Sequence, residues 1–495
     1  MRIRGLPELR AAGLLPCFEP ALRRRSSLAA EADPRLNAFF RPGTPIWIGR
    51  APGRLDVMGG IADYSGATVL ELPLDRATWA LLQRQAAPRI DLATRRGAEW
   101  GWFSIELAPL LFGELRAPEA LAKWFAEHDA DRWAAYVVGG VQLLLRRAAP
   151  SVEETIPGFR LLIDSAVPEG SGVASSAALE VAAMAAVAAS LEDTMSPAEL
   201  AAGCHWVENH IVGAPCGIMD QMTSACGRDD RLLRLRCQPA TIEGHVAVPR
   251  GYRFYGIDSG VRHAVSGAGY TTVRTAAFMG YRMIAGLAGL PATPDGERVR
   301  IEDHAWRGCL TNMPPAEFSA RYEFRLPEEM SGEEFLAGYA GTTDTVTRVE
   351  PGRKYPVRAA TAHPIQEQAR VTGFAETLAA ITGRPDAPTQ LGALMGESHA
   401  SYGRCGLGSD GTDRLVELVA AAGPARGLFG ARITGGGSGG TVAILGRDDA
   451  EAQVREIAAG YAAESGRGGE VFAGSGPGAA ETGVLLIEAG FPTVG

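Results

Sequence analysis

Cysteine is scarce in this sequence, and its few cysteines form no pairing pattern. Seven cysteines are spread over 495 residues, an odd number with no Cys-x-x-Cys pair. The spacing therefore indicates neither a disulfide framework nor a zinc site. Free thiols are typical of a reducing compartment, so we expect a cytoplasmic protein.

Long apolar runs are also absent. The longest, residues 177–189, is alanine-rich, is interrupted by Glu180 and is too short to cross a bilayer. The first residues contain only short apolar runs, so we expect no signal peptide and no membrane segment.

An excess of positive charge is missing too. The formal net charge is −9, and a general nucleic-acid binder would normally present a basic face. No Gly-Lys-Ser or Gly-Lys-Thr occurs in a glycine-rich loop, which excludes a Walker A phosphate loop. The composition, 46% hydrophobic and 21% charged, is that of a globular protein.

The order of strand-like and helix-like segments predicts an α+β chain of two domains. We expect an N-terminal extension at 1–44, a first domain at 45–245 and a second at 246–495. Charged, proline-rich sequence at about 293–360 predicts an irregular insertion or a set of short helices. Strands are expected at 45–49 before a turn at 51–53, and at 159–164, 254–258, 431–434 and 441–445. Helices are expected from about 176 and at 132–146, 270–288, 363–382, 388–402 and 411–423.

A glycine/serine loop at 168–180 lies between an expected strand and an expected helix. Glycines let the backbone approach a phosphate chain, and the helix N-terminus offers unpaired N–H groups. Serine hydroxyls can hold phosphate oxygens or Mg²⁺. A flexible turn with an N-capping serine is an equally good interpretation of this loop alone. The candidate phosphate-binding residues are Gly170, Ser171, Gly172, Ala174, Ser175 and Ser176.

Two carboxylates, Glu208 and Asp220, flank a break that contains Gly213, Pro215 and Gly217. One carboxylate could hold a metal ion while the other accepts a substrate proton. Asp220 stands among apolar residues, which is unusual for a solvated acid. It could equally be a helix N-cap.

Five glycines occur in the six positions from 435 to 440, between two expected strands. A plain hairpin loop would explain one or two of them. Close approach of the backbone to a ligand explains the excess better, which makes Gly436 and Gly437 candidate ATP-binding residues.

In this chain order, the segments resemble the three motifs of the GHMP kinase superfamily, and more narrowly of galactokinases. The segment APGRLDVMG at 51–59, followed by Asp63-Tyr64, resembles the first motif. The two glycine-rich loops resemble the second and third motifs. The resemblance implies a GHMP kinase fold with its active site in a cleft between two domains. It also implies an enzyme that uses ATP and Mg²⁺ to phosphorylate the anomeric hydroxyl of a small sugar.

The resemblance implies a role for each matching residue. Asp220 aligns with the catalytic aspartate and Arg54 with the arginine that supports it. Ser176 and Glu208 align with magnesium ligands. The expected sugar-contacting residues are Asp63, Gly217 and Tyr270.

Two positions depart from galactokinases, which carry Glu-His where this chain has Gly60 and Ile61. Those side chains meet the sugar C6 hydroxyl in galactokinases, and L-arabinopyranose lacks that hydroxymethyl group. An apolar side chain there would leave a galactose O6 unpaired, at a cost of about 1–3 kcal/mol. Ala174 also departs from galactokinases, which usually carry serine at that position.

The segments 51–64 and 208–227 resemble the kinase half of plant-type L-arabinokinases almost residue for residue. Those enzymes carry a glycosyltransferase-like half before the kinase. In this sequence only a short extension precedes the kinase motifs, so we expect a stand-alone kinase. The sequence therefore predicts an L-arabinokinase that forms β-L-arabinose 1-phosphate. A galactokinase is the alternative, and a non-catalytic sugar and ATP sensor is a further one; oligomeric state stays open.

Overall fold

The computed structural model describes residues 2–28, 33–96, 99–148, 156–262 and 268–488. Within these residues, nine strands form a mixed sheet with the path β1-β17-β2-β3-β6-β4-β5, and β7 and β8 continue from β3. Its strands are β1 (Ile3–Arg4), β2 (Ile46–Met58), β3 (Thr68–Gln85), β4 (Arg89–Arg96), β5 (Glu99–Glu106), β6 (Gly158–Ser165), β7 (Arg231–Arg236), β8 (Thr241–Ala247) and β17 (Val484–Ile487).

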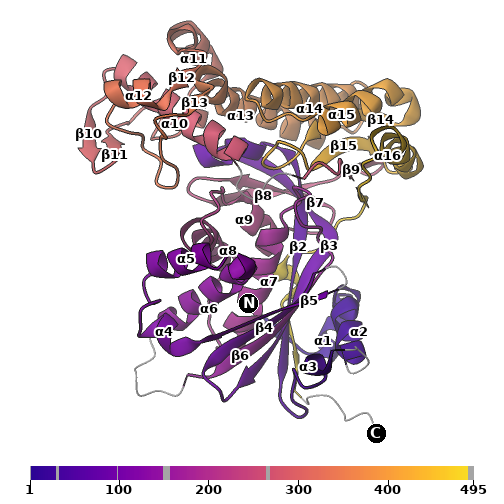
Figure 1. Ribbon diagram of the computed structural model, residues 1–495. Coiled ribbons are helices and arrows are strands. Elements are labelled where there is room, and N and C mark those ends of the chain that lie inside the picture. The colour runs from indigo at the N-terminus through magenta and orange to yellow at the C-terminus, as the bar shows by residue number, and fades with distance from the viewer. Residues whose placement is uncertain (1, 29–32, 97–98, 149–155, 263–267, 489–495) are drawn as a thin grey trace.

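Helices cover both faces of this sheet (Figure 1). The alanine-rich helix α7 packs directly on β2 and β3, because its small side chains allow close approach. The elements on one side are α4 (Leu107–Leu111), α5 (Pro118–Glu127), the 3-10 turn η4 (Asp129–Ala134), α6 (Ala135–Arg147), α7 (Ser175–Ser190), α8 (Pro197–Val207), the π-helical turn η5 (Glu208–Val212) and α9 (Met219–Cys226).

The N-terminal extension packs on the opposite face. Phe18 and Leu36 from it are buried against Ile48 and Trp79 of the sheet. Its elements are α1 (Leu6–Ala11), the 3-10 turn η1 (Leu15–Phe18), α2 (Glu19–Ser27) and α3 (Pro34–Asn37).

A second, four-stranded sheet with the order β14-β15-β9-β16 lies in the other half of the molecule (Figure 1). Its strands are β9 (Tyr252–Asp258), β14 (Leu428–Ile433), β15 (Thr441–Arg447) and β16 (Val471–Phe472). The helices around it are α10 (Ala268–Leu287), α13 (Val357–Ala379), α14 (Ala387–Arg404), α15 (Asp410–Ala422) and α16 (Glu451–Ser465), with the 3-10 turn η8 (Pro424–Arg426).

The charged segment at 293–360 folds into short elements beside α10 and α13 (Figure 1). Buried Phe318, Phe335 and Tyr355 anchor it to the core of this half. The elements are β10 (Ala292–Asp295), β11 (Arg298–Ile301), η6 (Leu310–Asn312), α11 (Pro315–Arg321), η7 (Glu323–Arg325), β12 (Met330–Ser331), α12 (Gly332–Gly338) and β13 (Lys354–Tyr355).

The expected turn at 51–53 is wrong: these residues lie inside β2. The pairing of β2 with β3 shifts register between Pro52 and Arg54, so the segment forms a bulge that accommodates a proline. A Cβ at Gly53 would lie 2.7 Å from the carbonyl oxygen of Val173, so glycine lets the glycine/serine loop approach the strand.

The C-terminal residues do not fit a division of the chain into two domains at residue 245. After α17 (Ala479–Thr482), β17 pairs with β2 and so belongs to the first sheet. No helix among the described residues is long and apolar enough to cross a membrane.

Candidate active site

A cavity of about 460 Å³ opens where the two halves of the molecule meet. The first half contributes residues from β2, the glycine/serine loop and the segment before α9. The second half contributes the start of α10 and the turn between β14 and β15. Nineteen of the described residues line it, among them Arg54, Asp63, Gly170, Gly172, Ala174, Ser175, Ser176, Gly217, Asp220, Tyr270, Gly436 and Gly437. These predicted site residues, separated by up to 383 positions in the chain, therefore surround one space.

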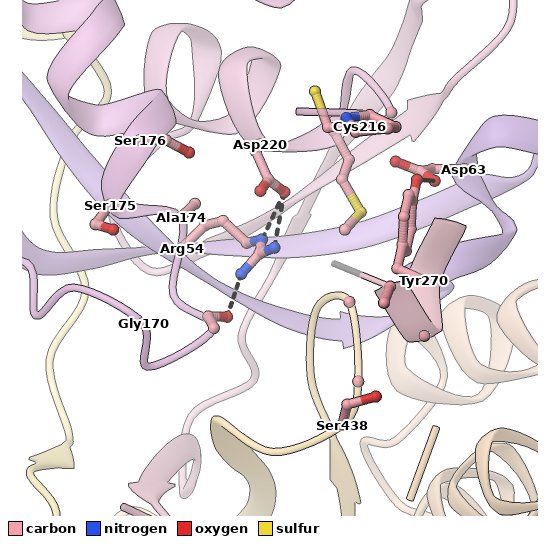
Figure 2. A pocket seen from close by; sticks show the side chains of 18 of the residues that line it. Arg54, Asp63, Gly170, Ala174, Ser175, Ser176, Cys216, Asp220, Tyr270 and Ser438 are labelled. Atoms are coloured by element: carbon pink, nitrogen blue, oxygen red, sulfur yellow. Dashed lines mark hydrogen bonds and ion pairs between the residues drawn. The ribbon is translucent and has the colours of Figure 1, made fainter. Parts of the chain in front are cut away.

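Arg54 and Asp220 form an ion pair at the centre of this cavity (Figure 2). Arg54 Nε donates to Asp220 Oδ1 at 2.9 Å, and Nη2 lies 2.8 Å from the same oxygen. Arg54 Nη1 donates to the carbonyl oxygen of Gly172 at 2.6 Å. Asp220 lies in the first turn of α9, whose N-cap is Ile218, so the N-cap interpretation of Asp220 is wrong.

Further buried carboxylates surround the guanidinium. Glu71 Oε2 lies 3.2 Å from Arg54 Nε, and the Glu71 side chain is fully buried. Burial alone would lower the pKa of Arg54, but Asp220, Glu71 and Asp56 together raise it. Burial raises the pKa of Asp220, and Arg54 opposes that rise. A base with a raised pKa beside a permanent cation suits proton acceptance.

The two glycine-rich segments contact each other. Thr441 Oγ1 donates to the carbonyl oxygen of Ser171 at 2.7 Å, and a Cβ at Gly440 would lie 3.0 Å from that oxygen. The 435–440 segment does connect two antiparallel strands, as a hairpin would. It also lines the cavity through Gly436 and Gly437, so it serves as both hairpin and cavity wall.

The N-terminus of α7 faces the cavity through Ser175 and Ser176 (Figure 2). Its N-cap is Ala174 in the left-handed conformation, with φ 60°, and it makes no side-chain cap, so the N-capping-serine interpretation is wrong. The first N–H groups of a sixteen-residue helix therefore point toward the space where an anion could bind.

Ser176 and Glu208 lie together behind this helix end. Burial and Asp220 raise the pKa of Glu208 to about 7, while hydrogen bonds from Ser176, Cys216 and Gln221 oppose the rise. Among the described residues, no group of three or more His, Cys, Asp or Glu side chains is arranged to hold a metal ion. One carboxylate and one hydroxyl fit Mg²⁺ that takes its other ligands from phosphates and water.

Asp63 and Tyr270 lie at the other end of the cavity, across from α7 (Figure 2), and Gly217 lies beside Asp63. Tyr270 Oη donates to Asp63 Oδ1 at 3.5 Å, and the backbone N–H of Tyr64 donates to the same oxygen at 2.6 Å. A Cβ at Gly217 would lie 1.6 Å from Asp63 Oδ2, so only glycine fits beside this carboxylate. Burial and Asp220 raise the pKa of Asp63 to about 7.

Gly60 and Ile61 are not among the residues that line the cavity; both are fully buried. Ile61 packs in the core of the second half, and its backbone N–H donates to Tyr402 Oη at 2.9 Å. A Cβ at Gly60 would lie 1.7 Å from that same hydroxyl oxygen. Tyr402 therefore fills the space into which a side chain at position 60 would project.

Sequence reasoning missed three polar groups of the site. Glu71 carries no motif signal, because it stands in an apolar strand and its ion-pair partner, Arg54, lies 17 positions earlier in the chain. Arg262 lines the cavity, is half exposed and forms an ion pair with Asp258 at 2.8 Å. It also donates to Ser171 Oγ. Cys216 lines the cavity and its thiol lies 3.4 Å from Glu208 Oε2.

Comparison with known proteins supports the arrangement. The family description "GHMP kinases N terminal domain" matches residues 135–228, and "GHMP kinases C terminal" matches residues 385–463. A galactokinase from Chloroflexus aggregans is 31% identical over 434 residues, covering 87% of this chain and 91% of that protein. The chain belongs to the GHMP kinase family. Its mixed helices and sheets are the fold expected of a GHMP kinase.

Two further relatives of this GHMP kinase extend the comparison. An L-arabinokinase from Arabidopsis thaliana is 42% identical over 489 residues, which covers 89% of this chain. The chain spans about half the length of that relative, 47%. The crystal structure of Lactococcus lactis galactokinase complexed with galactose matches with a TM-score of 0.68 and 20% identity, covering 93% of this chain and 99% of that one. That likeness confirms the predicted fold.

Proposed function

We propose that this GHMP kinase transfers the γ-phosphoryl group of ATP to the anomeric hydroxyl of L-arabinose, giving β-L-arabinose 1-phosphate. The observation that carries the proposal is the Arg54–Asp220 ion pair, which lies in one cavity between the N-terminus of α7 and the Asp63–Tyr270 end. The identity of 42% to an L-arabinokinase, against 31% to a galactokinase, supports the pentose.

The proposed chemistry assigns Asp220 as the proton acceptor. One of its oxygens is held by Arg54, and the side chain remains 21% exposed to the cavity. Arg54 counters the negative charge that develops on the transferring group. The reaction then depends mainly on holding the two substrates in line.

The helix end at Ser175 and Ser176 and the 435–440 turn would hold the phosphates of ATP. Ser176 and Glu208 would bind Mg²⁺, which neutralises phosphate charge when it is present. Arg262 adds a cation at the edge of the same end. Asp63, Tyr270 and Gly217 would contact the sugar.

The absence of a side chain at position 60 supports the pentose over D-galactose as substrate. Gly60 has no side chain that could hydrogen-bond a C6 hydroxyl, and Tyr402 fills the space into which one would project. Ile61 is buried away from the cavity, so it does not contact a bound sugar directly.

The deciding experiment compares kcat/KM for L-arabinose and D-galactose with purified protein, by ADP release. We expect L-arabinose to be preferred by at least about tenfold, the effect of one unpaired sugar hydroxyl. Equal values, or a preference for D-galactose, would support the galactokinase alternative. Ligand binding without ATP consumption would support a sensor.

The division into a domain at 45–245 and a domain at 246–495, with the cavity between them, stays part of the proposal, except that β17 belongs to the first sheet. The seven cysteines are free thiols in the structure, which is compatible with work in the cytoplasm.

A further inference from the structure

Arg274 is buried below the proposed sugar end of the cavity, in α10. It forms a bidentate ion pair with Asp344: Nε donates to Oδ2 and Nη2 donates to Oδ1, both at 2.8 Å. The two side chains are only 7% and 2% exposed. Asp344 belongs to the 293–360 insertion, between α12 and β13, so this pair connects the insertion to α10.

The insertion itself fixes the Asp344 carboxylate. Thr347 Oγ1 donates to Oδ2 at 2.6 Å, and the backbone N–H groups of Val346 and Thr347 donate to the carboxylate at 3.1 and 3.2 Å. Thr275 Oγ1 in α10 donates to Thr347 Oγ1 at 3.0 Å. Both carboxylate oxygens are therefore held in place before they meet Arg274.

The third nitrogen of the Arg274 guanidinium contacts the cavity wall. Its Nη1 donates to the carbonyl oxygen of Cys216 at 3.1 Å, and Cys216 lines the cavity immediately before Gly217. The guanidinium also lies 5.8 Å from the centre of the Tyr64 ring, next to Asp63 in the chain. Tyr270, one helical turn before Arg274, lines the same end.

Arg274 acts on Asp63 through its charge as well. Burial raises the pKa of Asp63, and the Arg274 cation opposes that rise. An unpaired Arg274 would be costly to bury, so the cation needs Asp344 to remain in this position.

We propose that Arg274 and Asp344 are positioning residues through which the 293–360 insertion fixes the sugar end of the active site. This inference rests on the proposed function, in which Asp63, Gly217 and Tyr270 contact the sugar. The insertion then contributes directly to the site, because it places a rigid carboxylate under the cation that holds the 215–217 wall.

Asp344→Asn tests the proposal by its effect on the two substrates. We expect KM for the sugar to rise about tenfold, the loss of one charge-assisted hydrogen bond, while KM for ATP changes by less than about twofold. Glu328→Gln is the matched control, because Glu328 forms an exposed ion pair with Arg358 in the same insertion. It should change neither constant. An equal rise of both KM values in Asp344→Asn would overturn the proposal.

A double variant separates positioning from stability. Arg274→Met with Asp344→Leu leaves no unpaired charge, so the melting temperature should recover toward the wild-type value. The KM for the sugar should stay raised, because the Cys216 carbonyl has lost its hydrogen bond from Arg274 and keeps only its contacts with Asn209 and His205. Recovery of KM together with stability would show a purely structural pair.

Hydrogen–deuterium exchange without substrate tests the coupling independently of activity. Asp344→Asn should speed exchange in a peptide that covers residues 213–218, and Glu328→Gln should not. Unchanged exchange in Asp344→Asn would contradict the coupling even if the enzyme phosphorylates L-arabinose. Faster exchange in a protein that phosphorylates no sugar would contradict the proposed function instead.

Discussion

Arg54 holds one oxygen of Asp220 with two of its three nitrogens. Nε and Nη2 both reach Oδ1, at 2.9 and 2.8 Å, and among the described residues no donor is seen to reach Oδ2. The carboxylate is thereby oriented, with one oxygen fixed by the cation and the other free for a substrate hydroxyl. Geometry of this kind places a base before the substrate arrives.

Replacement of Asp220 should separate chemistry from binding. We expect Asp220→Asn and Asp220→Ala to lower kcat by at least about a hundredfold, because proton acceptance is lost. Sugar affinity, measured by calorimetry, should change little. Asp164→Asn is a control, since Asp164 pairs with Arg24 outside the cavity. Turnover near that of the wild type in Asp220→Ala would refute the assignment.

Glu71 should hold its proton to a higher pH than an ordinary glutamate. It is fully buried, and burial together with Asp56 raises its pKa well above the usual value, although Arg54 lies 3.2 Å away. Glu71→Gln keeps the shape of the side chain and removes only its ability to ionise, so stability and kcat at pH 7 should stay near wild type. Glu71→Leu removes the polar contact to Arg54 and should lower kcat. A large loss of stability in Glu71→Gln would show that Glu71 is ionised.

Asp63 should make stability depend on pH. Its pKa is raised to about 7 in the folded protein, so the folded state binds a proton more tightly than the unfolded chain. The stability that this proton contributes is lost as the pH rises toward 7. Asp63→Asn needs no proton, so its melting temperature should exceed that of the wild type more at pH 8 than at pH 5.

The same titration should affect substrate binding. The Asp63 carboxylate is the better hydrogen-bond acceptor, so wild-type affinity for the sugar should weaken as the pH falls below about 7. Calorimetry at several pH values would measure this. An affinity that is independent of pH from 5 to 8 would exclude Asp63 as the sugar-binding acceptor.

Gly60 should tolerate no side chain. Its φ is 45°, and a Cβ would lie 1.7 Å from Tyr402 Oη. Gly213 is the matched control, since it has φ 72° and a Cβ there would meet nothing within 4 Å. Gly213→Ala should cost about 1–2 kcal/mol of unfolding free energy from backbone strain alone. Gly60→Ala should cost about 1–3 kcal/mol more, from overpacking.

Tyr402→Phe should relieve part of that clash. The double variant Gly60→Ala with Tyr402→Phe is expected to be more stable in denaturant unfolding than Gly60→Ala alone. If Gly60→Ala costs no more than Gly213→Ala, Tyr402 does not fill the space beside position 60.

The two serines at the start of α7 should differ in their effect on the metal ion. Ser176 contacts Glu208, so Ser176→Ala and Glu208→Gln should both raise the Mg²⁺ concentration needed for half-maximal activity. Ser175→Ala, the control one position earlier, should raise KM for ATP with less effect on Mg²⁺. The opposite pattern would assign the metal to Ser175.

Most of the strands and helices that the sequence predicted agree with the structure within a few residues. The expected strand at 254–258 is β9, and the expected helix at 270–288 is α10. Long periodic segments with glycine or proline at their ends carry strong local signals. The turn expected at 51–53 was wrong, because pairing with β3 on both sides of the bulge overrode the local preference of proline and glycine.

The sequence by itself determined the family and the main residues at the cavity, because glycine-rich loops and their flanking acids are local patterns. The resemblance implied that Arg54 supports Asp220, but only the tertiary structure gave the geometry of that ion pair across 166 positions and added Glu71 to it. It also placed Tyr402 beside Gly60 and Asp344 beneath Arg274. These contacts join separate segments of the chain, and no local pattern encodes a distance between side chains that meet only when both halves have folded.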